Sequence, residues 1–323
     1  MAQPLFYMLL SVVIPTYNNA QLLQRCLRSI ADARLGEAVQ VVVVDDGSDD
    51  AEQPLLSAVA DQPPLPLQMV RQAHKGAAAA RNAGIDVAEG RFVCFVDADD
   101  RVAPQSLRLV VSLLEQMPHE VPLLHTGPML DAECSAEVAP ASGDINLVTP
   151  GQVLRPRSAC LDHTTYFIDR HLLVAHPELR YPEEHHLLED SAFVLSLLAT
   201  VKQLYEAPNC RPYIRCHDAP SATSGAWDSR RCERFLPDIH WFLSLLHDYC
   251  VSHSAWPSAE ALYRRYAYLY LRVLAVKGCP WALLKPLRSQ LLRDDFRPHS
   301  LKERLVCNAA ALRVVSSLSR LLR

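Results

Sequence analysis

The apolar run at residues 92–96 ends directly in a cluster of three carboxylates, Asp97, Asp99 and Asp100. A run of this kind, bounded by turn signals, predicts a buried strand, so the acids lie where a strand leaves an α/β sheet, the usual place for a ligand crevice. Three acids this close repel one another. A hard divalent cation, which prefers oxygen ligands, would neutralise this repulsion, and such a cation often binds phosphate oxygens as well. The alternative is a solvated acidic turn that caps a helix beginning near Pro104.

Three further segments of the N-terminal half have the composition of buried strands. Residues 9–15 and 39–44 are continuous apolar, β-branched runs, and 65–71 is a third candidate, followed by a helical pattern at 76–88. Strands that alternate with helices of about ten to fifteen residues predict βαβ units and a parallel sheet with right-handed crossovers. The C-terminal ends of these strands then share one edge of the sheet. That edge carries Thr16, Tyr17, Asn18, Asp45, Asp46, Asp97, Asp99 and Asp100.

Four short blocks follow these strands in a fixed order. The chain has Pro-Thr-Tyr-Asn at 15–18, Val-Asp-Asp-Gly-Ser at 44–48, Ala-Arg-Asn-Ala-Gly at 80–84 and Asp-Ala-Asp-Asp at 97–100. In this order and spacing they resemble the pattern of family-2 glycosyltransferases, closely over residues 9–105 and more loosely to about 225. The resemblance implies a GT-A fold, which is a Rossmann-like, mostly parallel α/β sheet flanked by helices, followed here by a C-terminal helical region.

The turn after the first strand offers a place for a nucleotide base. A base needs a flat partner and an edge that matches its hydrogen bonds, and Tyr17 with the Thr16 backbone offers both. By resemblance, Asp45 accepts the imide N–H of uracil, and a carboxylate, which accepts but does not donate, suits uracil better than cytosine. The alternatives are a capping aromatic at Tyr17 and an ordinary turn with a helix cap at 45–48. The residues assigned to a nucleotide-sugar donor, with UDP favoured, are Pro15, Thr16, Tyr17, Asn18, Asp45, Asp46, Arg81, Asp97, Arg215 and His217.

Arg81 emerges from a helix otherwise made of small residues beside the acidic crevice. It can pair with Asp45 or Asp97 or reach the diphosphate, and the resemblance favours the diphosphate region. The resemblance also implies that Asp97 holds the ribose or metal side, that Asp99 ligates the ion directly and that Asp100 is a third ligand. The implied cofactor is Mn²⁺ or Mg²⁺, a Lewis acid that stabilises the departing diphosphate.

A base for the acceptor hydroxyl is expected in the second half of the chain. The segment 180–193 resembles the family's aromatic-Pro-Glu stretch, which leads to a Glu-Asp pair opening a helix. We assign Asp190 as the base and Glu189 as the neighbour that orients it. The alternative is structural, because the helix dipole favours acids at a helix N-terminus whatever their function. His185 and His186 either line the acceptor pocket or are ordinary polar surface.

A further segment, around Arg215 and His217, resembles the short strand and flexible loop that closes over the donor in many relatives. The composition of residues 219–226 suits a mobile lid. Both side chains would then lie near the diphosphate. The alternative is a surface hairpin.

The domain prediction follows the change in composition near residue 226. Residues 1–226 form the predicted GT-A domain, with a nucleotide-sugar half at 1–128 and an acceptor half at 129–226, and residues 227–323 are helical. Helices are predicted at 231–250, 258–277, 281–293 and 301–322, and residues 131–152 are predicted to be an irregular loop.

The net charge of −4 conceals a basic C-terminal segment. Residues 280–323 contain nine basic and three acidic residues, a net charge of +6. An amphipathic helix at 301–322 with this charge is compatible either with an anionic membrane surface or with packing on the catalytic domain. No nucleic-acid-binding motif accompanies it. The scattered cysteines, the lack of a signal peptide and the lack of a spanning apolar stretch predict a cytoplasmic enzyme, at most peripheral on the inner face of the membrane and unlike the processive synthases.

The sequence thus favours an inverting, non-processive glycosyltransferase. It would move one sugar from a UDP-sugar to a glycan or lipid-linked acceptor in the synthesis of a surface polysaccharide such as lipopolysaccharide, capsule or exopolysaccharide. Two other classes stay open. A nucleotidyltransferase would show a Gly-rich phosphate loop after the first strand, which residues 15–19 lack. A non-catalytic sugar-nucleotide or glycan-binding protein on the same scaffold would keep the donor residues and need no base.

Overall fold

The computed structural model describes residues 8–61, 65–132, 144–154, 161–217, 229–253 and 279–293, with the short stretches 262–263, 265–267, 270–271, 274 and 308. The chain divides into two units that interleave along the sequence. Unit 1 consists of Met1–Pro150, Cys160–Glu184 and Glu189–Ala219. Unit 2 consists of Gly151–Ala159, His185–Leu188 and Pro220–Arg323.

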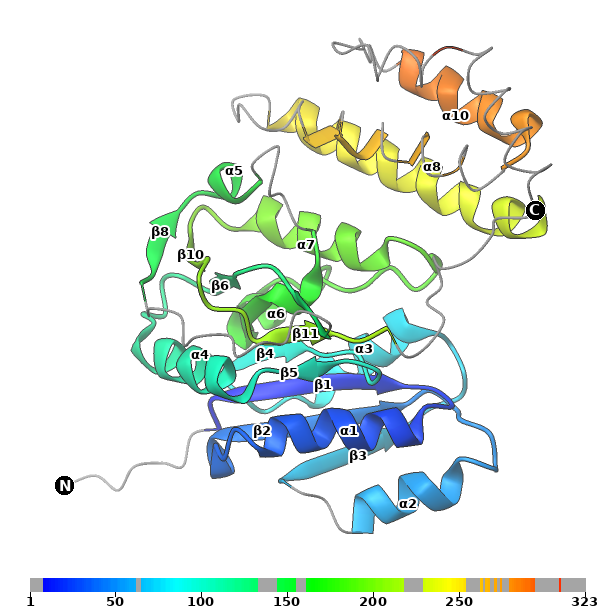
Figure 1. Ribbon diagram of the computed structural model, residues 1–323. Coiled ribbons are helices and arrows are strands. Elements are labelled where there is room, and N and C mark those ends of the chain that lie inside the picture. Colours follow the sequence, from blue (N-terminus) through cyan, green and yellow to red (C-terminus); the bar gives the residue numbers. More distant parts are fainter. Residues whose placement is uncertain are drawn as a thin grey trace. The chain divides into compact units, whose positions relative to one another are not determined.

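Unit 1 is built on an eight-stranded sheet with the strand order β3-β2-β1-β4-β9-β6-β10-β8 (Figure 1). The strands are β1 (Leu10–Thr16), β2 (Val39–Asp45), β3 (Leu67–Arg71), β4 (Phe92–Phe95), β6 (Leu123–Thr126), β8 (Asn146–Val148), β9 (Tyr166–Asp169) and β10 (Leu204–Ala207). β1 to β4 pair in parallel, β6 pairs in parallel with β10, and β9 and β8 are antiparallel to their neighbours. The four predicted strands and the mostly parallel sheet are therefore confirmed.

The register of the central strands brings their C-terminal ends together. Thr16 at the end of β1 lies opposite Asp45 at the end of β2. On the other side of β1, Val13 lies opposite Phe95 at the end of β4, so Asp97 follows at the same edge. β2 is buried along its whole length, as its run of β-branched residues predicts.

Helices cover both faces of this part of the sheet. They are α1 (Ala20–Ala31), α2 (Gln53–Asp61), α3 (Ala77–Val87) and α4 (Pro104–Gln116). Val12 belongs to a core cluster with Leu23 of α1 and Val110 of α4, whereas a Cβ atom on Gly84 of α3 would come within 2.3 Å of the neighbouring Val13. Because successive side chains of a strand point to opposite faces, α1 and α4 lie on one face of the sheet and α3 on the other. Only glycine at position 84 permits this close approach of α3.

The second half of unit 1 adds a small sheet and further helices. β5 (Arg101–Val102), β11 (Tyr213–Arg215) and β7 (Leu130–Asp131) form a three-stranded sheet with β11 in the middle. The helices here are α6 (Arg170–Ala175), α7 (Glu189–Thr200) and the 3₁₀ turn η3 (His163–Thr165). The 3₁₀ turn η1 (Gly36–Ala38) lies earlier, directly before β2, and α5 (Pro150–Val153) begins at Pro150 of unit 1 and continues into unit 2. The prediction of an irregular loop over 131–152 is wrong in part, because β8 pairs with β10 and α5 begins at Pro150. That pairing joins segments distant in sequence, so no local pattern reveals it.

The described residues of unit 2 include two long helices, α8 (Ser229–Ser252) and α10 (Trp281–Arg293). They confirm the helices predicted at 231–250 and 281–293. The side-chain amide of Gln290 on α10 donates to the hydroxyl of Ser244 on α8 at 2.7 Å, and Leu243 and Leu287 are fully buried. The predicted helix at 258–277 is described only in fragments, and the helix at 301–322 and the lid at 219–226 lie outside the described residues. In the part of the chain that the structure describes, no helix is both long and apolar enough to span a membrane.

Candidate active site

The turn after β1 presents an aromatic surface at the edge of the sheet. Tyr17 is 42% exposed, and its ring stacks on that of His74 with 4.2 Å between the ring centroids. His74 is fixed in turn by Asp46, whose carboxylate lies 2.8 Å from its Nδ1. His74 was not among the predicted site residues, because it lies outside the four blocks, in the connection between β3 and α3. The stacked pair offers a flat face of the kind a nucleotide base needs.

Asn18 ties this turn to the one after β2. Its side chain donates to Asp49 Oδ2 and accepts from the Asp49 backbone N–H, both at 2.8 Å, and its own N–H donates to Ser48 Oγ at 2.9 Å. Asn18 has φ of 51°, in the left-handed region that Asn tolerates better than most residues. Pro15 lies within β1, and Thr16 is buried at its end.

Asp45 and Asp46 are both buried and build the turns around them. Asp45 Oδ1 accepts the N–H of Ser48 at 2.9 Å. Asp46 accepts the N–H groups of Lys75 at 2.9 Å and Gly76 at 2.8 Å, at the start of α3. Gly76 has φ of 97°, which favours glycine there. Both aspartates therefore hold the backbone, and contact of Asp45 with a base stays a prediction.

Arg81 connects the two acidic clusters predicted from the sequence. Its guanidinium is buried and donates to Asp97 Oδ1 at 3.0 Å and to Glu189 Oε1 at 3.2 Å. It also lies over the ring of Tyr181, 5.3 Å from the centroid. Of the partners predicted for Arg81, the structure shows Asp97; contact with a diphosphate stays a prediction. Burial by itself would raise the pKa of Asp97, but the charge of Arg81 outweighs it and holds that pKa below its ordinary value.

The remaining acids of the cluster differ in their surroundings. Asp100 accepts hydrogen bonds at both oxygens, from the Tyr213 hydroxyl and from the Cys216 N–H at 2.6 Å. Burial raises the pKa of Asp100 to about 6. Burial, followed by the charge of Asp97, also raises the pKa of Asp99. Asp100 as a third metal ligand stays a prediction, and in this structure its carboxylate is already used by β11 and the residue after it.

Glu189 and Asp190 open helix α7, as predicted. Burial, above all, raises the pKa of Glu189 in spite of Arg81. Burial also acts to raise the pKa of Asp190, but the nearby His163 and Arg81 outweigh it and lower that pKa. His163 Nδ1 lies 3.8 Å from Asp190 Oδ2. His163 could not be predicted from the sequence, because only the fold places η3 beside α7.

Asn82 holds the segment that leads toward α7. Its side-chain amide donates to the carbonyl of Tyr181 and to Glu183 Oε1, both at 2.9 Å, and its oxygen accepts the N–H of Tyr181. The Tyr181 ring stacks on Phe193 at 4.1 Å. This explains why Asn follows Arg in the third block.

Arg215 is the last residue of β11 and His217 follows the strand, and each side chain lies against an acid. Arg215 is within 3.4 Å of Asp162 Oδ2, and His217 Nε2 is 2.9 Å from Asp131 Oδ1. Both side chains are about half exposed. Their predicted role beside a diphosphate is not tested by these contacts.

His185 and His186 belong to unit 2, where Asp238 of α8 holds them. Asp238 lies 2.9 Å from His185 Nδ1 and accepts the N–H groups of His186 at 2.9 Å and Leu187 at 3.0 Å. The His185 ring also stacks on Trp241 at 3.6 Å. An acceptor-binding role for these histidines stays a prediction.

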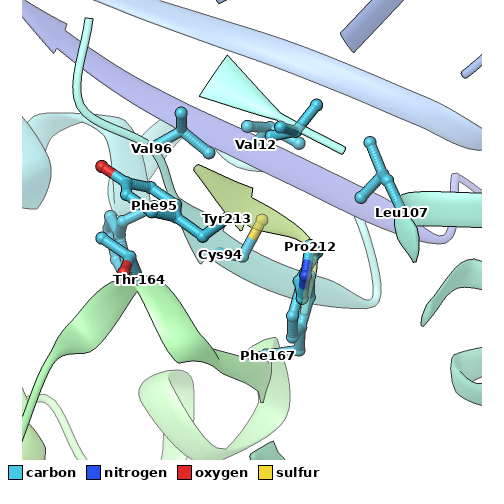
Figure 2. Close-up of a pocket in the computed structure, with 10 residues that line it drawn as sticks. Val12, Cys94, Phe95, Val96, Leu107, Thr164, Phe167, Pro212 and Tyr213 are labelled. Atoms are coloured by element: carbon cyan, nitrogen blue, oxygen red, sulfur yellow. The ribbon is translucent and has the colours of Figure 1, made fainter. Parts of the chain in front are cut away.

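A small apolar cavity lies within the core of unit 1 (Figure 2). Its volume of about 10 Å³ is at the lower limit for one water molecule. It is therefore a packing gap and not a sugar-nucleotide site. The lining residues are Val12, Cys94, Phe95, Val96, Val102, Leu107, Thr164, Phe167, Pro212 and Tyr213.

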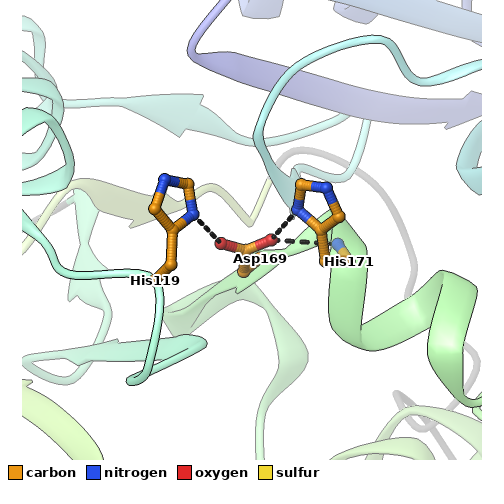
Figure 3. A group of neighbouring side chains, drawn as sticks. All are labelled: His119, Asp169 and His171. Atoms are coloured by element: carbon orange, nitrogen blue, oxygen red, sulfur yellow. Dashed lines mark hydrogen bonds and ion pairs between the residues drawn. The ribbon is translucent and has the colours of Figure 1, made fainter.

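A different set of possible metal ligands, His119, Asp169 and His171, lies at the opposite end of β4 (Figure 3). Among the described residues, no other group of three His, Cys, Asp or Glu brings its ligand atoms within 4.8 Å of one another. Asp169 already pairs with Arg91 at 3.3 Å and caps α6 by accepting the N–H of His171. The ion pair with Arg91 and the cap of α6 are therefore sufficient to explain why Asp169 lies here. The acids after β4 do not form a complete protein cage, so an ion there would also need oxygens of a ligand.

Part of the chain matches a known protein family. Residues 11–126 match the model of Glycosyl transferase family 2. The succinoglycan biosynthesis protein ExoO of Rhizobium meliloti is 40% identical over 99 residues, which cover 31% of this chain and 28% of ExoO. The chain spans about a third of the length of the curated relatives it matches.

Two solved structures share the fold of this chain over almost its whole length. TarS 1–349 of S. aureus, in complex with UDP-GlcNAc, superposes with a TM-score of 0.63 at 19% identity, over 98% of this chain and 93% of that one. The mannosyltransferase PcManGT of Pyrobaculum calidifontis, in complex with GDP-Man and Mn²⁺, gives a TM-score of 0.52 at 18% identity, over 99% and 88%. Residues 11–126 therefore carry the match to glycosyl transferase family 2, and the chain has the GT-A fold.

Proposed function

We propose that the protein is an inverting glycosyltransferase that moves one sugar from a UDP-sugar to a hydroxyl of a glycan or lipid-linked acceptor. The observation that carries the proposal is the chain of contacts from Asp97 through Arg81 to Glu189, with Asp190 next to it. It joins the acids after β4, suited to a metal and diphosphate, to a carboxylate suited to activate a hydroxyl. A purely structural pair of acids at a helix N-terminus would not need a buried arginine shared with the other cluster.

The donor proposed is a uridine diphosphate sugar. Tyr17 and His74 supply a stacked aromatic surface beside the buried carboxylate of Asp45. TarS, which shares the fold, is described in complex with UDP-GlcNAc, and this likeness makes UDP-GlcNAc the first donor to test.

The proposed metal ligands are Asp99 and Asp97, with Asp100 as the third. The donor set fits a hard cation because all three ligands are carboxylates, and burial together with repulsion from Asp97 raises the pKa of Asp99. When bound, Mn²⁺ or Mg²⁺ supplies Lewis-acid stabilisation of the charge on the departing diphosphate. Arg81 keeps Asp97 ionised and in place. PcManGT is described with Mn²⁺, which supports testing this ion first.

The proposed base is Asp190. Its lowered pKa keeps the carboxylate ionised, as a base that takes the proton of an acceptor hydroxyl must be. Direct attack by that hydroxyl on the anomeric carbon inverts its configuration. Glu189 accepts from Nη1 of Arg81 while Asp97 accepts from Nη2, and in this proposal Glu189 orients Asp190.

The proposed acceptor lies in surface-polysaccharide synthesis, a role supported by the similarity to ExoO over part of the chain. A cytoplasmic location, with residues 280–323 reversibly on an anionic membrane surface, is proposed from their net charge of +6. Vesicle co-sedimentation that weakens with salt is the observation that would support it.

A screen of sugar nucleotides tests the function. We expect Mn²⁺-dependent release of nucleoside diphosphate, beginning with UDP-GlcNAc, and a decrease in turnover of about 10² to 10⁴ in Asp190→Asn at unchanged UDP affinity. Asp86→Asn, a change of an exposed acid, is the matched control and retains activity. Release of pyrophosphate would indicate a nucleotidyltransferase. Donor binding with equal turnover in Asp190→Asn and wild type would indicate a binding protein or a different base.

A further inference from the structure

His163 is a buried histidine whose ring makes no ordinary hydrogen bond. It is 3% exposed, and neither ring nitrogen has a hydrogen-bond partner. Buried polar side-chain atoms without a partner are rare in folded proteins because they lose their hydrogen bonds to water. An imidazole at this position therefore needs an explanation beyond packing.

The surroundings of the ring suit an apolar aromatic side chain. The rings of Phe95 and Tyr181 each meet the His163 ring edge to face, with 5.7 Å between centroids. Asp162 fixes the backbone by capping η3 through the N–H of Thr164 at 3.0 Å. A phenylalanine would satisfy this pocket without the cost of two unpaired nitrogens.

The polar group in front of the ring is the carboxylate of Asp190. Its Oδ2 lies 3.8 Å from His163 Nδ1, and its Oδ1 accepts the N–H of Ser191 at 2.6 Å. A distance of 3.8 Å is about 1 Å longer than a hydrogen bond. Catalytic hydrogen bonds are often long without substrate and shorten in the complex.

Oδ1 of Asp190 is thus held by a backbone N–H, whereas Oδ2 lies near His163 without an ordinary hydrogen bond to it. A carboxylate has about four lone-pair positions, so each oxygen still has one to offer to an acceptor hydroxyl. A carboxylate held at both oxygens keeps one orientation, whereas one held at a single oxygen can rotate. Orientation of the base within a fraction of an ångström affects the rate of proton transfer strongly.

We propose that His163 is a positioning residue for Asp190, in which the Nδ1–H of the imidazole donates to Oδ2 and fixes the carboxylate toward the acceptor hydroxyl. The proposal rests on the proposed role of Asp190 as the base. The lowered pKa of Asp190, which His163 helps to cause against the effect of burial, supports it.

Two substitutions at position 163 separate positioning from packing. Asn places an N–H donor near the position of Nδ1 but leaves the rest of the ring space empty. Phe fills the ring space but cannot donate. We expect His163→Phe to lower kcat by about tenfold, a part of the contribution of the base itself, with KM for the donor unchanged, and His163→Asn to stay within about threefold of wild type. A packing role predicts the reverse order, and Phe at or above Asn in kcat overturns the proposal.

The chain contains a matched control in His125 on β6. His125 is also buried, has two unpartnered ring nitrogens and lies 3.8 Å from a carboxylate, that of Glu206, with its ring stacked on Tyr166. None of these residues has a role at the proposed site. His125→Phe is expected to leave kcat unchanged, and a loss equal to that of His163→Phe would show a general effect of buried histidines and overturn the specific role.

A double-mutant cycle separates this proposal from the function on which it rests. With turnover measured as UDP release from UDP-GlcNAc, or from the sugar nucleotide that the screen selects, His163→Phe should cause no further loss in an Asp190→Asn background. If Asp190→Asn retains full turnover, the proposed base is wrong. If Asp190→Asn is impaired and His163→Phe is not, only the positioning role is wrong.

A second measurement needs no substrate. In protein labelled with ¹⁵N-histidine, the resonances lost in His163→Phe identify the imidazole, and their shifts report which nitrogen carries hydrogen. We expect a protonated Nδ1. A ring with hydrogen on Nε2 alone cannot donate to Asp190 and overturns the proposal.

Discussion

Two sets of carboxylates lie at the same edge of the sheet and are held in opposite ways. Asp45 and Asp46, after β2, are 1% and 3% exposed and accept backbone N–H groups of the turns that they build. Asp97 and Asp99, after β4, lie close to each other, and Asp97 depends on a buried arginine for its charge. Asp45 and Asp46 therefore stabilise the fold, whereas the repulsion between Asp97 and Asp99 does not. The acids after β4 are therefore the part of this edge where we propose that a ligand binds.

Asp99→Ala should have the largest effect on activity and the smallest on stability. We expect it to abolish Mn²⁺-dependent turnover, because it removes the proposed direct ligand, and to leave the melting temperature equal or higher, because repulsion from Asp97 is relieved. Nucleoside diphosphate release at saturating Mn²⁺ measures the activity, and a thermal melt measures the stability. Full activity in this variant would contradict the metal assignment.

Asp46→Ala should behave in the opposite way. It leaves the N–H groups of Lys75 and Gly76 without their acceptor, so the free energy of unfolding should fall by about 2 to 4 kcal/mol. Urea denaturation measures this, and Asp46→Asn, which keeps one acceptor oxygen, should lose less. Equal stability of Asp46→Ala and wild type would show that the two sets of acids do not differ as described.

The pH dependence of metal binding should show whether the acids after β4 are the metal ligands. Burial raises the pKa of Asp100 to about 6, and the pKa of Asp99 is also raised, so both acids take up protons at a higher pH than ordinary carboxylates. A cation binds the ionised form, and its affinity must therefore fall as the pH drops through 6. Titration calorimetry with Mn²⁺ at pH 7.5 and 5.5 should show a loss of about tenfold. Constant affinity down to pH 5 would mean that these acids are not the ligands.

Substitution of Tyr17 should have the smallest effect of these changes. Tyr17→Ala removes the flat surface beside His74 and should raise the Kd for UDP by about fivefold, the lower part of the range for base stacking on an aromatic ring. Tyr17→Phe keeps the ring and serves as the control. A change in UDP affinity as large in the Phe variant would assign the effect to the hydroxyl.

The sequence predicted the parallel part of the sheet because β1, β2 and β4 are continuous apolar runs followed at once by polar turns. The same register explains why the acids after these strands could be placed at one edge. The four blocks extended this prediction to the family, since their residues lie close to the strands they follow. Arg81 and Asp97, only sixteen residues apart, were correctly paired as one of several options.

Contacts over long sequence distances could not be predicted in this way. Arg81 and Glu189 are 108 residues apart, and Tyr213 and Asp100 are 113 apart. His163 and His74 carry no pattern in their own segments, and only the fold places them beside Asp190 and Tyr17. The pairing of β8 with β10 was missed for the same reason.

The hydrogen bonds of Asp238 to residues 185–187 affect how this architecture can be recombined. Residues 185–188 belong with α8, although the chain enters them from Glu184 and leaves them into Glu189, and Leu188 has a φ of 70° that few non-glycine residues adopt. A chimera that took only the C-terminal helices from a relative would pair the native residues 185–188 with the relative's helix in place of α8. The exchangeable part is discontinuous, and a functional hybrid should carry residues 185–188 together with α8.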